Sequence, residues 1–332
     1  MRLFAFFCIG AMFCLVDFTG TSGAWAQDHA AAAAPKRSPT PAATRAAAQS
    51  AGANFLIDNA TNNLGIGYQS LANDSACCNT AVGYGTLVSN TAANNSAFGA
   101  DSLLSNTTGS ANTALGNYAA FSNTTGGSNT AVGTYASFCD TLGNGNVAVG
   151  TDALNGGTVG GACQITSQNV SYNTAVGNGA QYNDTSGSEN TGVGQGALYN
   201  ITTGSYDTAL GFNAGEYVNG AGPNVTSLDS TYIGANSQAN ASGDTNEIVI
   251  GYATVGNGSN TTTIGNGSTT DTYIAGKLHV NGALQATVLT GAAAPSGSCT
   301  VGELYMNTAA TSVSTVLYVC YPANTWTAIT VP

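Results

Sequence analysis

Asn79-Thr80-Ala81-Val82-Gly83 is the stretch of sequence that decides the fold, because the chain repeats it. The same five residues occur as Asn129-Thr130-Ala131-Val132-Gly133 and as Asn173-Thr174-Ala175-Val176-Gly177, and weaker copies lie between and beyond them. The final glycines of the copies are Gly67, Gly83, Gly99, Gly116, Gly133, Gly150, Gly177, Gly194, Gly211, Gly234, Gly251 and Gly265. They lie 16 or 17 residues apart in eight of the eleven intervals. Such a period predicts an all-β fold, a parallel β-roll or β-solenoid of about twelve coils.

The order of residues inside the motif predicts a short strand. Thr80 and Val82 alternate with Ala81 and Gly83, which is the two-residue period of a β-strand. One face of the strand therefore carries very small side chains and is called the tiny face, and the other face carries larger and mostly β-branched residues. In a stack of coils, equivalent side chains lie one strand spacing apart, about 4.8 Å. The position before the glycine is apolar in every copy, as at Val82, Val132 and Val176.

The asparagine and the glycine of the motif have expected structural roles. Stacked asparagines can hydrogen-bond from coil to coil and cap a turn, which is the role predicted for Asn79, Asn129 and Asn173. The glycine is expected to allow a bend or a close approach of backbones, at Gly83, Gly133 and Gly177. No catalytic, cofactor-binding or metal-ligating set is expected in the array.

The direction in which the apolar column points is left open by the sequence. If the tiny face fills the interior, the Val/Ile/Leu column forms a long exposed stripe, which soluble monomers avoid. Self-association with cyclic symmetry would cover it. In the alternative, the large residues point inward and one chain suffices.

The two ends of the chain differ from the array. Arg2, an apolar run from Leu3 to Val16 and Ala24-Trp25-Ala26 predict a signal peptide over residues 1–26, and hence a secreted or cell-surface protein. Residues 27–53 are rich in Ala and Pro and predict a flexible linker. The array is expected over 54–276. Residues 277–332 predict an exit segment and a small C-terminal β-hairpin module.

Charge excludes two classes of partner. No Lys or Arg occurs from Ala46 to Gly276. Nucleic-acid binding needs basic side chains against phosphates, so no nucleic-acid partner is expected. A polybasic contact with anionic lipid is excluded on the same ground. No stretch after the signal peptide is long and apolar enough for a helical membrane span, so no transmembrane anchor is expected in this chain.

The cysteines predict disulfides, because the chain is expected to be exported. Six remain after cleavage of the signal peptide, and an even number in an exported protein favours pairing. Cys299 and Cys320 could close the C-terminal hairpin. Cys139 and Cys163 flank a coil and part of a long insertion between Gly150 and Gly177. Cys77 and Cys78 are adjacent and stay unassigned, because a bond between neighbours would be strained.

The repeated Asn-Thr-Ala-Val-Gly with small and apolar residues after it resembles the head repeats of trimeric autotransporter adhesins, the YadA-like heads. The resemblance covers roughly residues 63–276. It implies a left-handed parallel β-roll, trimeric assembly and binding to host matrix or to other cells. The stretch Thr272 to Gly276 is also similar to the C-terminal region of fibre proteins of the phage-tail type.

The predicted function follows from these observations. We expect an exported structural or adhesive surface protein, not an enzyme, that presents a repetitive β-roll face to a host or cell-surface protein or glycan. One alternative is a solenoid enzyme acting on polysaccharide, for which Asp101 and Asp152 would be the paired carboxylates; three coils separate them, roughly 14 Å, which is more than that mechanism uses. A second alternative is an ice-binding solenoid with a regular Thr-rich face.

Overall fold

The structure is a computed structural model. It describes residues 55–58, 60–159, 162–163, 169–220, 222–270, 272–277, 279, 281, 289–291, 304–307, 317–320 and 325–329. The expected signal peptide (1–26) and linker (27–53) lie outside these residues. The chain divides into two compact units, with the boundary between Thr269 and Thr270. All regular secondary structure in the described residues is β, so the predicted fold class is confirmed.

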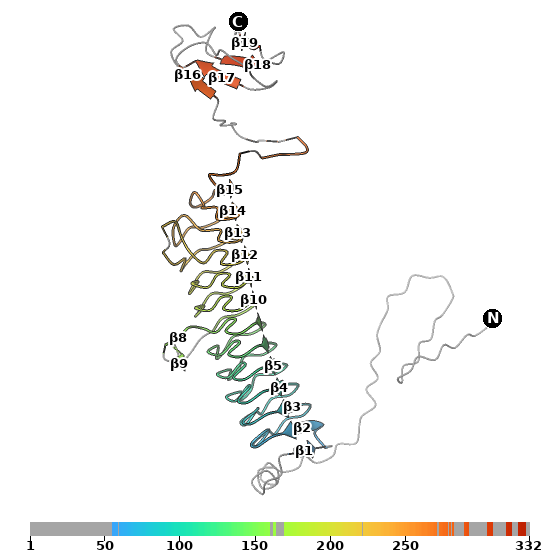
Figure 1. Cartoon of the computed structure of the whole chain (residues 1–332). Coiled ribbons are helices and arrows are strands. Elements are labelled where there is room, and N and C mark those ends of the chain that lie inside the picture. Colours follow the sequence, from blue (N-terminus) through green and yellow to red (C-terminus); the bar gives the residue numbers. More distant parts are fainter. Residues whose placement is uncertain are drawn as a thin grey trace, which may run out of the picture. The chain divides into compact units, whose positions relative to one another are not determined.

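The first unit is a parallel β-solenoid (Figure 1). Its thirteen-stranded sheet follows the order of the chain, except that the insertion strands β8 and β9 lie outside it. The strands are β1 (Phe55–Asp58), β2 (Asn63–Ile66), β3 (Thr80–Val82), β4 (Ser96–Phe98), β5 (Thr113–Leu115), β6 (Thr130–Val132), β7 (Val147–Val149), β10 (Thr174–Val176), β11 (Thr191–Val193), β12 (Thr208–Leu210), β13 (Thr231–Ile233), β14 (Ile248–Ile250) and β15 (Thr262–Ile264).

The strands pair in the register that the repeat predicts. Thr80, Ala81 and Val82 lie opposite Ser96, Ala97 and Phe98, and every later pair in the sheet repeats this match. The strands from β2 to β15 are parallel and bound about eleven turns, close to the dozen coils expected. The antiparallel strand β1, which pairs with β2, is not part of the repeat and was not predicted.

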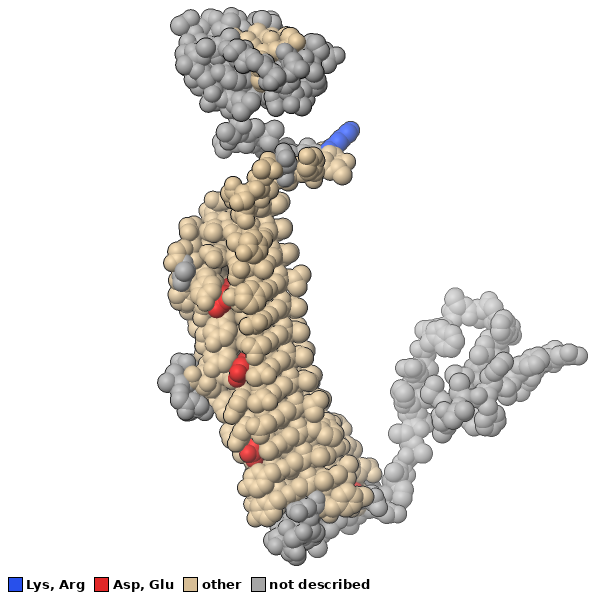
Figure 2. Space-filling model, in the orientation of Figure 1, with Lys and Arg blue, Asp and Glu red and all other residues tan. Residues whose placement is uncertain are grey.

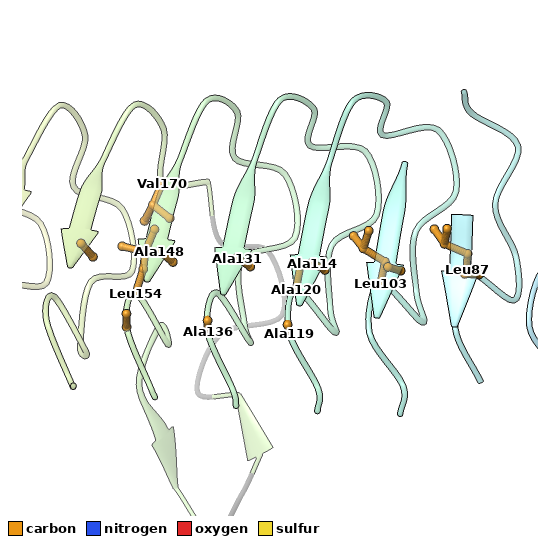
Figure 3. Close-up of a cluster of buried hydrophobic side chains, with 14 of the residues drawn as sticks. Leu87, Leu103, Ala114, Ala119, Ala120, Ala131, Ala136, Ala148, Leu154 and Val170 are labelled. Carbon is orange, nitrogen blue, oxygen red and sulfur yellow. The ribbon is translucent and has the colours of Figure 1, made fainter. Parts of the chain in front are cut away.

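The interior of the coil has two walls. One wall is the tiny face of the strands, where Ala81, Ala131 and Ala175 are fully buried. The other wall comes from the turn after the strand, four residues beyond the motif glycine, where Leu87, Leu103 and Leu154 are fully buried. Figure 3 shows these two sets of side chains meeting inside the stack. Each buried leucine contributes roughly 2 kcal/mol of hydrophobic stabilisation.

The turn leucines enter the core through an unusual backbone conformation. Leu87, Leu103 and Leu154 have φ values of 49°, 50° and 49°. This left-handed conformation costs an L-residue roughly 1–2 kcal/mol, which the burial of the side chain offsets. The chain uses the conformation to turn a corner within very few residues, and so closes a coil of about 17 residues around a narrow core.

The motif glycine lies where neighbouring coils touch. Gly133 has φ +136°, and a Cβ atom added there would lie 2.4 Å from the carbonyl oxygen of Gly150 in the next coil. Gly83 and Gly177 show the same φ range and the same contact with the next motif glycine. The position therefore requires glycine for two independent reasons, the backbone angle and the close approach.

The motif asparagines form a ladder between side chain and backbone. Asn129 Oδ1 accepts a hydrogen bond of 2.9 Å from the backbone N–H of Asn146 in the next coil. Its Nδ2 donates to the carbonyl oxygen of Gly143 in that coil, at 2.8 Å. Each asparagine from Asn63 to Asn190 makes the first of these bonds to the following coil, and Asp207 continues the series. One side chain thus satisfies two buried backbone groups of its neighbour.

A second ladder runs through the turns, seven residues after the motif glycine. Asn106 Nδ2 donates to Asn90 Oδ1 at 2.7 Å, and Asn123 Nδ2 donates to Asn106 Oδ1 at 2.8 Å. Asp140 and Asp184 occupy the same position in later coils, and Ile201 replaces the polar residue after them. The polar groups of this ladder are buried and depend on one another for hydrogen bonds.

The second unit contains a four-stranded sheet in the order β16 (Leu289–Gly291), β17 (Leu304–Asn307), β18 (Leu317–Cys320) and β19 (Trp326–Ile329). Strands β17, β18 and β19 are antiparallel, as the predicted hairpin requires, and β16 is parallel to β17. The predicted Cys299–Cys320 disulfide falls outside the described residues, because Cys299 and the side chain of Cys320 are not among them.

Replacement of a motif glycine tests the close approach of the coils. We predict that Gly133→Ala lowers the free energy of unfolding by at least roughly 1–3 kcal/mol, the cost of the disfavoured backbone angle alone. Thermal and urea unfolding followed by circular dichroism would measure it. Gly267→Ala is the control, because nothing lies within 4 Å of a Cβ atom there. Equal stability of the two variants would contradict the packing described.

Removal of one ladder side chain tests the asparagine bonds. Asn129→Ala leaves the Asn146 N–H and the Gly143 carbonyl buried without their partner, and each orphaned group costs about 1–3 kcal/mol. Asn178→Ala serves as the matched control, because Asn178 is exposed and donates only to the Thr151 carbonyl at 3.3 Å. We expect a clear loss of stability in chemical unfolding for the first variant and little for the second.

Candidate interaction surfaces

The solenoid carries an apolar stripe along the outside of its sheet. We call the residues before the motif glycines the outer stripe; they are Ile66, Val82, Phe98, Leu115, Val132, Val149, Val176, Val193, Leu210, Ile233, Ile250 and Ile264. Leu115 and Leu210 are 50% and 51% exposed, and Val132 and Val176 are half-buried. The sequence left two orientations open, and in the structure the tiny face points inward and the apolar column points outward.

The outer stripe runs in register over the whole array. Its members lie opposite one another in successive strand pairs, as Val82 does with Phe98 and Leu115 with Val132. A parallel column with Thr80, Thr130 and Thr174 lies on the same outer face, two residues earlier in each strand. The outer face of the sheet is therefore regular and uncharged, with an apolar column along its length.

Acidic residues are sparse on the array. On the face that Figure 2 shows, they reach the surface at a few separate points between ridges of uncharged side chains. Among the described residues, no three His, Cys, Asp or Glu side chains come close enough together to hold a metal ion. In the same residues, no helix has the length and apolar character to cross a membrane.

The long insertion between β7 and β10 forms a small hairpin. Its strands β8 (Thr158–Val159) and β9 (Ala162–Cys163) are antiparallel. The expected disulfide between Cys139 and Cys163 is present and ties the hairpin to the preceding coil, with Cα atoms 5.4 Å apart. Cys77 and Cys78, which the sequence left unassigned, are free and exposed, and their Sγ atoms are 2.7 Å apart.

Aromatic side chains gather beside this insertion. Tyr118 and Tyr135 stack with ring centroids 5.3 Å apart, and Phe121 and Phe138 stack at 5.2 Å. Further along the array, Tyr182 and Tyr199 stack at 4.9 Å. The residues Tyr135, Phe138, Asp152, Asn155, Thr158 and Tyr182 line a cleft of about 330 Å³, which we call the insertion cleft. Sequence reasoning missed this cleft, although the aromatic residues recur five positions after the motif glycines.

The structure does not pair the two carboxylates considered for glycoside hydrolysis. Asp101 follows β4 and Asp152 follows β7, so they occupy the same turn position three coils apart. Burial raises the pKa of both carboxyl groups. Among the described residues that line the insertion cleft, Asp152 is the one carboxylate. The cleft thus lacks the acid and base pair that hydrolysis of a glycosidic bond needs.

Three buried aspartates have strongly raised carboxyl pKa values. Burial raises the pKa of Asp140 to about 7, although the backbone N–H of Gly143 and the side chain of Asn146 donate to the carboxylate and act against the shift. Burial raises the pKa of Asp207 to about 7 as well. Asp184 is raised well above its ordinary value by burial, and Asp140 adds to the shift by repulsion between the two charges.

No protein-family model, curated protein or solved structure matches this chain. The class of protein is therefore defined by its own geometry. It is a parallel β-solenoid whose narrow core is built from alanine and leucine, with an apolar stripe outside and one disulfide-anchored hairpin on its flank.

The buried aspartates predict a pH dependence of stability. In the unfolded chain an aspartate has a pKa near 3.9, so the folded state binds more protons than the unfolded state between about pH 4 and pH 7. Stability is thus greatest below about pH 4 and is lost as the pH rises to about 7. We predict that Asp140→Asn reduces the loss between pH 5 and pH 8 by roughly 1–3 kcal/mol, because one titrating group is removed.

Urea unfolding of the wild type and the variant at both pH values measures this effect. The control is Glu189→Gln, which removes an exposed carboxylate and keeps the buried aspartates and their neighbours. A wild-type stability that rises from pH 5 to pH 8 would contradict the assignment.

Proposed function

We propose that this protein is an exported structural or adhesive surface protein that assembles as a homotrimer and presents its β-roll to a protein or glycan partner. The observation that carries the proposal is the outer stripe. It extends over all twelve parallel strands of the sheet, and its members are exposed or half-buried in the single chain. A repetitive rod that has one apolar face, and in whose described residues no catalytic set of side chains is recognised, is suited to assembly with other copies and to contact with a partner.

The outer stripe supports assembly because burying it is favourable. Each Leu, Ile or Phe at the stripe loses roughly 1 kcal/mol or more of unfavourable hydration when a neighbouring chain covers its exposed half. Cyclic symmetry allows identical stripes to face one axis, so that the assembly closes and does not grow. The resemblance of the repeats to the heads of trimeric autotransporter adhesins favours three chains over two.

The remaining faces support contact with a partner. Once the stripes are covered, the accessible surface consists of the turns, which are rich in Asn, Thr and Ser. These side chains offer hydrogen bonds from many equivalent positions, and the absence of Lys and Arg over the array disfavours polyanionic partners. The signal peptide predicted over residues 1–26 supports an exported or cell-surface location.

The outward-facing threonines support one alternative function, the binding of ice. Thr80, Thr130 and Thr174 lie at strand spacing on the same face as the stripe, which is an arrangement suited to ordering water and binding ice. The same face cannot both be covered in a trimer and bind ice. Thermal hysteresis in a freezing assay, together with a monomeric mature chain, would favour the ice-binding alternative.

The stripe is tested by placing charge on it. We predict that the mature wild-type chain sediments at three times the mass of one protomer. The double variant Leu115→Asp/Leu210→Asp is expected to sediment as a monomer with an unchanged circular dichroism spectrum, because both side chains are already half exposed in the single chain. Thr108→Asp, at an exposed turn away from the stripe, is the control and stays trimeric.

Adhesion is measured with the same three proteins. The trimer at micromolar concentration is expected to bind to cells or to immobilised matrix protein and glycan, and the monomeric variant to bind more weakly because it loses multivalency. A monomeric wild type would contradict the assembly, and a trimer that retains no cells or matrix would contradict the adhesive role.

A further inference from the structure

The aromatic column beside the insertion has a gap of one ring. Five residues after the motif glycine, successive coils carry Phe121, Phe138, Asn155, Tyr182 and Tyr199. The rings stack above and below Asn155, with centroid separations of 5.2 Å for Phe121 and Phe138 and 4.9 Å for Tyr182 and Tyr199. Asn155 therefore interrupts a continuous aromatic stack. Phe138 and Tyr182 are two strand spacings apart, roughly 9.6 Å.

The insertion cleft lies at this gap. Phe138 and Tyr182 line it from the coils on either side, and Tyr135 adds a third aromatic ring. A flat ring placed between two aromatic faces needs roughly two contact distances of 4 Å. Asn155 occupies the layer between the two rings, but its side chain is shorter than theirs, so a ring would lie beyond the end of this amide. The volume of about 330 Å³ lies within the range of small-ligand sites, and the aromatic lining is typical of them.

The cleft also contains polar groups that are available to the edge of a bound ring. Asp152 accepts a hydrogen bond of 3.0 Å from Asn155 Nδ2. The hydroxyl groups of Thr158 and Tyr182 lie 2.9 Å apart. Asn155 is 2% exposed, and its Oδ1 has no hydrogen-bond partner. A buried amide oxygen without a donor is costly, so a hydroxyl group of a bound molecule that donates to it would be favourable.

The cleft is held in shape without a ligand. The Cys139–Cys163 disulfide fixes the insertion hairpin beside Phe138, the residue that precedes Cys139. The backbone N–H groups of Gly156 and Gly157 both donate to the carbonyl oxygen of Tyr182, at 2.9 and 2.8 Å. Tyr135 has φ 58°, an uncommon angle for a bulky residue, and stacking on Tyr118 holds it there. Such preorganisation lowers the entropic cost of binding.

The charges of the array restrict what can bind. Among the described residues that line the cleft, Asp152 is the one charged residue, and no Lys or Arg occurs between Ala46 and Gly276. Anionic sugars, phosphates and acidic peptides are therefore disfavoured. The lining residues offer three aromatic rings, one carboxylate, one amide and three hydroxyl groups, which together suit a neutral ring that carries several hydroxyl groups.

We propose that the insertion cleft binds a neutral saccharide, with one pyranose ring lying between Phe138 and Tyr182. Asp152 accepts hydrogen bonds from its hydroxyl groups, and a further sugar hydroxyl donates to Asn155 Oδ1 after a small rotation of the amide. The site binds the sugar without cleaving it, because Asp152 is the one carboxylate among its described lining residues. This inference rests on the proposed function. It names a glycan as the partner and the insertion cleft as the site where that glycan binds.

Binding of sugars to the full mature chain tests the site. A panel of neutral mono- and oligosaccharides built from glucose, galactose, mannose and N-acetylglucosamine would be screened by saturation-transfer NMR, and hits measured by calorimetry. We expect binding of at least one neutral sugar, and no binding of sialic acid or of sulfated glycans. Asp152→Asn and Tyr182→Ala each lower the affinity at least tenfold.

The chain offers a matched control for each variant. Asp101→Asn changes the same turn position in a distant coil, where the backbone angle is also left-handed, and retains full affinity. Tyr84→Ala removes an exposed tyrosine outside the cleft and also retains it. Since Asp152→Asn keeps the shape of the side chain, this variant still tests the site if Tyr182→Ala fails to fold. The monomeric variant Leu115→Asp/Leu210→Asp separates the two proposals, because the cleft lies within one chain and its affinity is expected to be unchanged in the monomer.

Three outcomes would overturn the inference. These are no binding of any neutral sugar at millimolar concentration, binding that neither cleft variant weakens, and binding of tyrosine- or tryptophan-containing peptides with no sugar. A trimer that adheres to cells but binds no sugar would refute the cleft alone. A sugar-binding chain that is monomeric and non-adhesive would refute the wider proposal alone.

Discussion

The whole array depends on one constraint: each coil must lie directly on its neighbour with like residues in contact. The strands are three residues long, and a pair of such strands makes too few hydrogen bonds to fix its own register. The asparagine ladder supplies what the strands lack, since each asparagine binds an N–H and a carbonyl of the next coil. A coil shifted by one residue would break both bonds and place alanine outside and valine inside.

This constraint also explains the composition of the chain. In most coils the narrow core holds alanine on one wall and leucine or a smaller residue on the other, and Tyr232 and Val249 replace alanine in β13 and β14. Charged residues of one sign would repel at a spacing of about 4.8 Å, so they are nearly absent from the columns. The exceptions include the buried aspartates Asp140, Asp184 and Asp207, which occupy asparagine positions of the two ladders. The pKa values of these carboxyl groups are raised because an acid occupies a buried position that a neutral amide fills in other coils.

Much of this could be predicted from sequence because periodicity carries it. The period of the glycines gave the stack, the alternation of Thr80 to Gly83 gave the strand, and the Asn column indicated a ladder. The sequence could not decide which face of the strand pointed inward, because Leu87 and Leu103 enter the core through a left-handed turn that no propensity signals. The strand β1 has no repeat signature. The insertion cleft could not be predicted, because the aromatic residues that line it come from coils on either side of a long insertion. The missing ring at Asn155 is recognised only when these coils are aligned in the structure.

The antiparallel strand β1 has a consequence for the end of the rod at which the array begins. The first strand of a parallel sheet would leave a row of unpaired N–H and carbonyl groups, a template on which another copy of the same coil could add. Because β1 pairs with β2 in the opposite direction, it covers that row, and its own outer edge does not continue the parallel pattern. A further parallel coil would find no matching edge at this end, so end-to-end stacking of copies in the pattern of the array is disfavoured there.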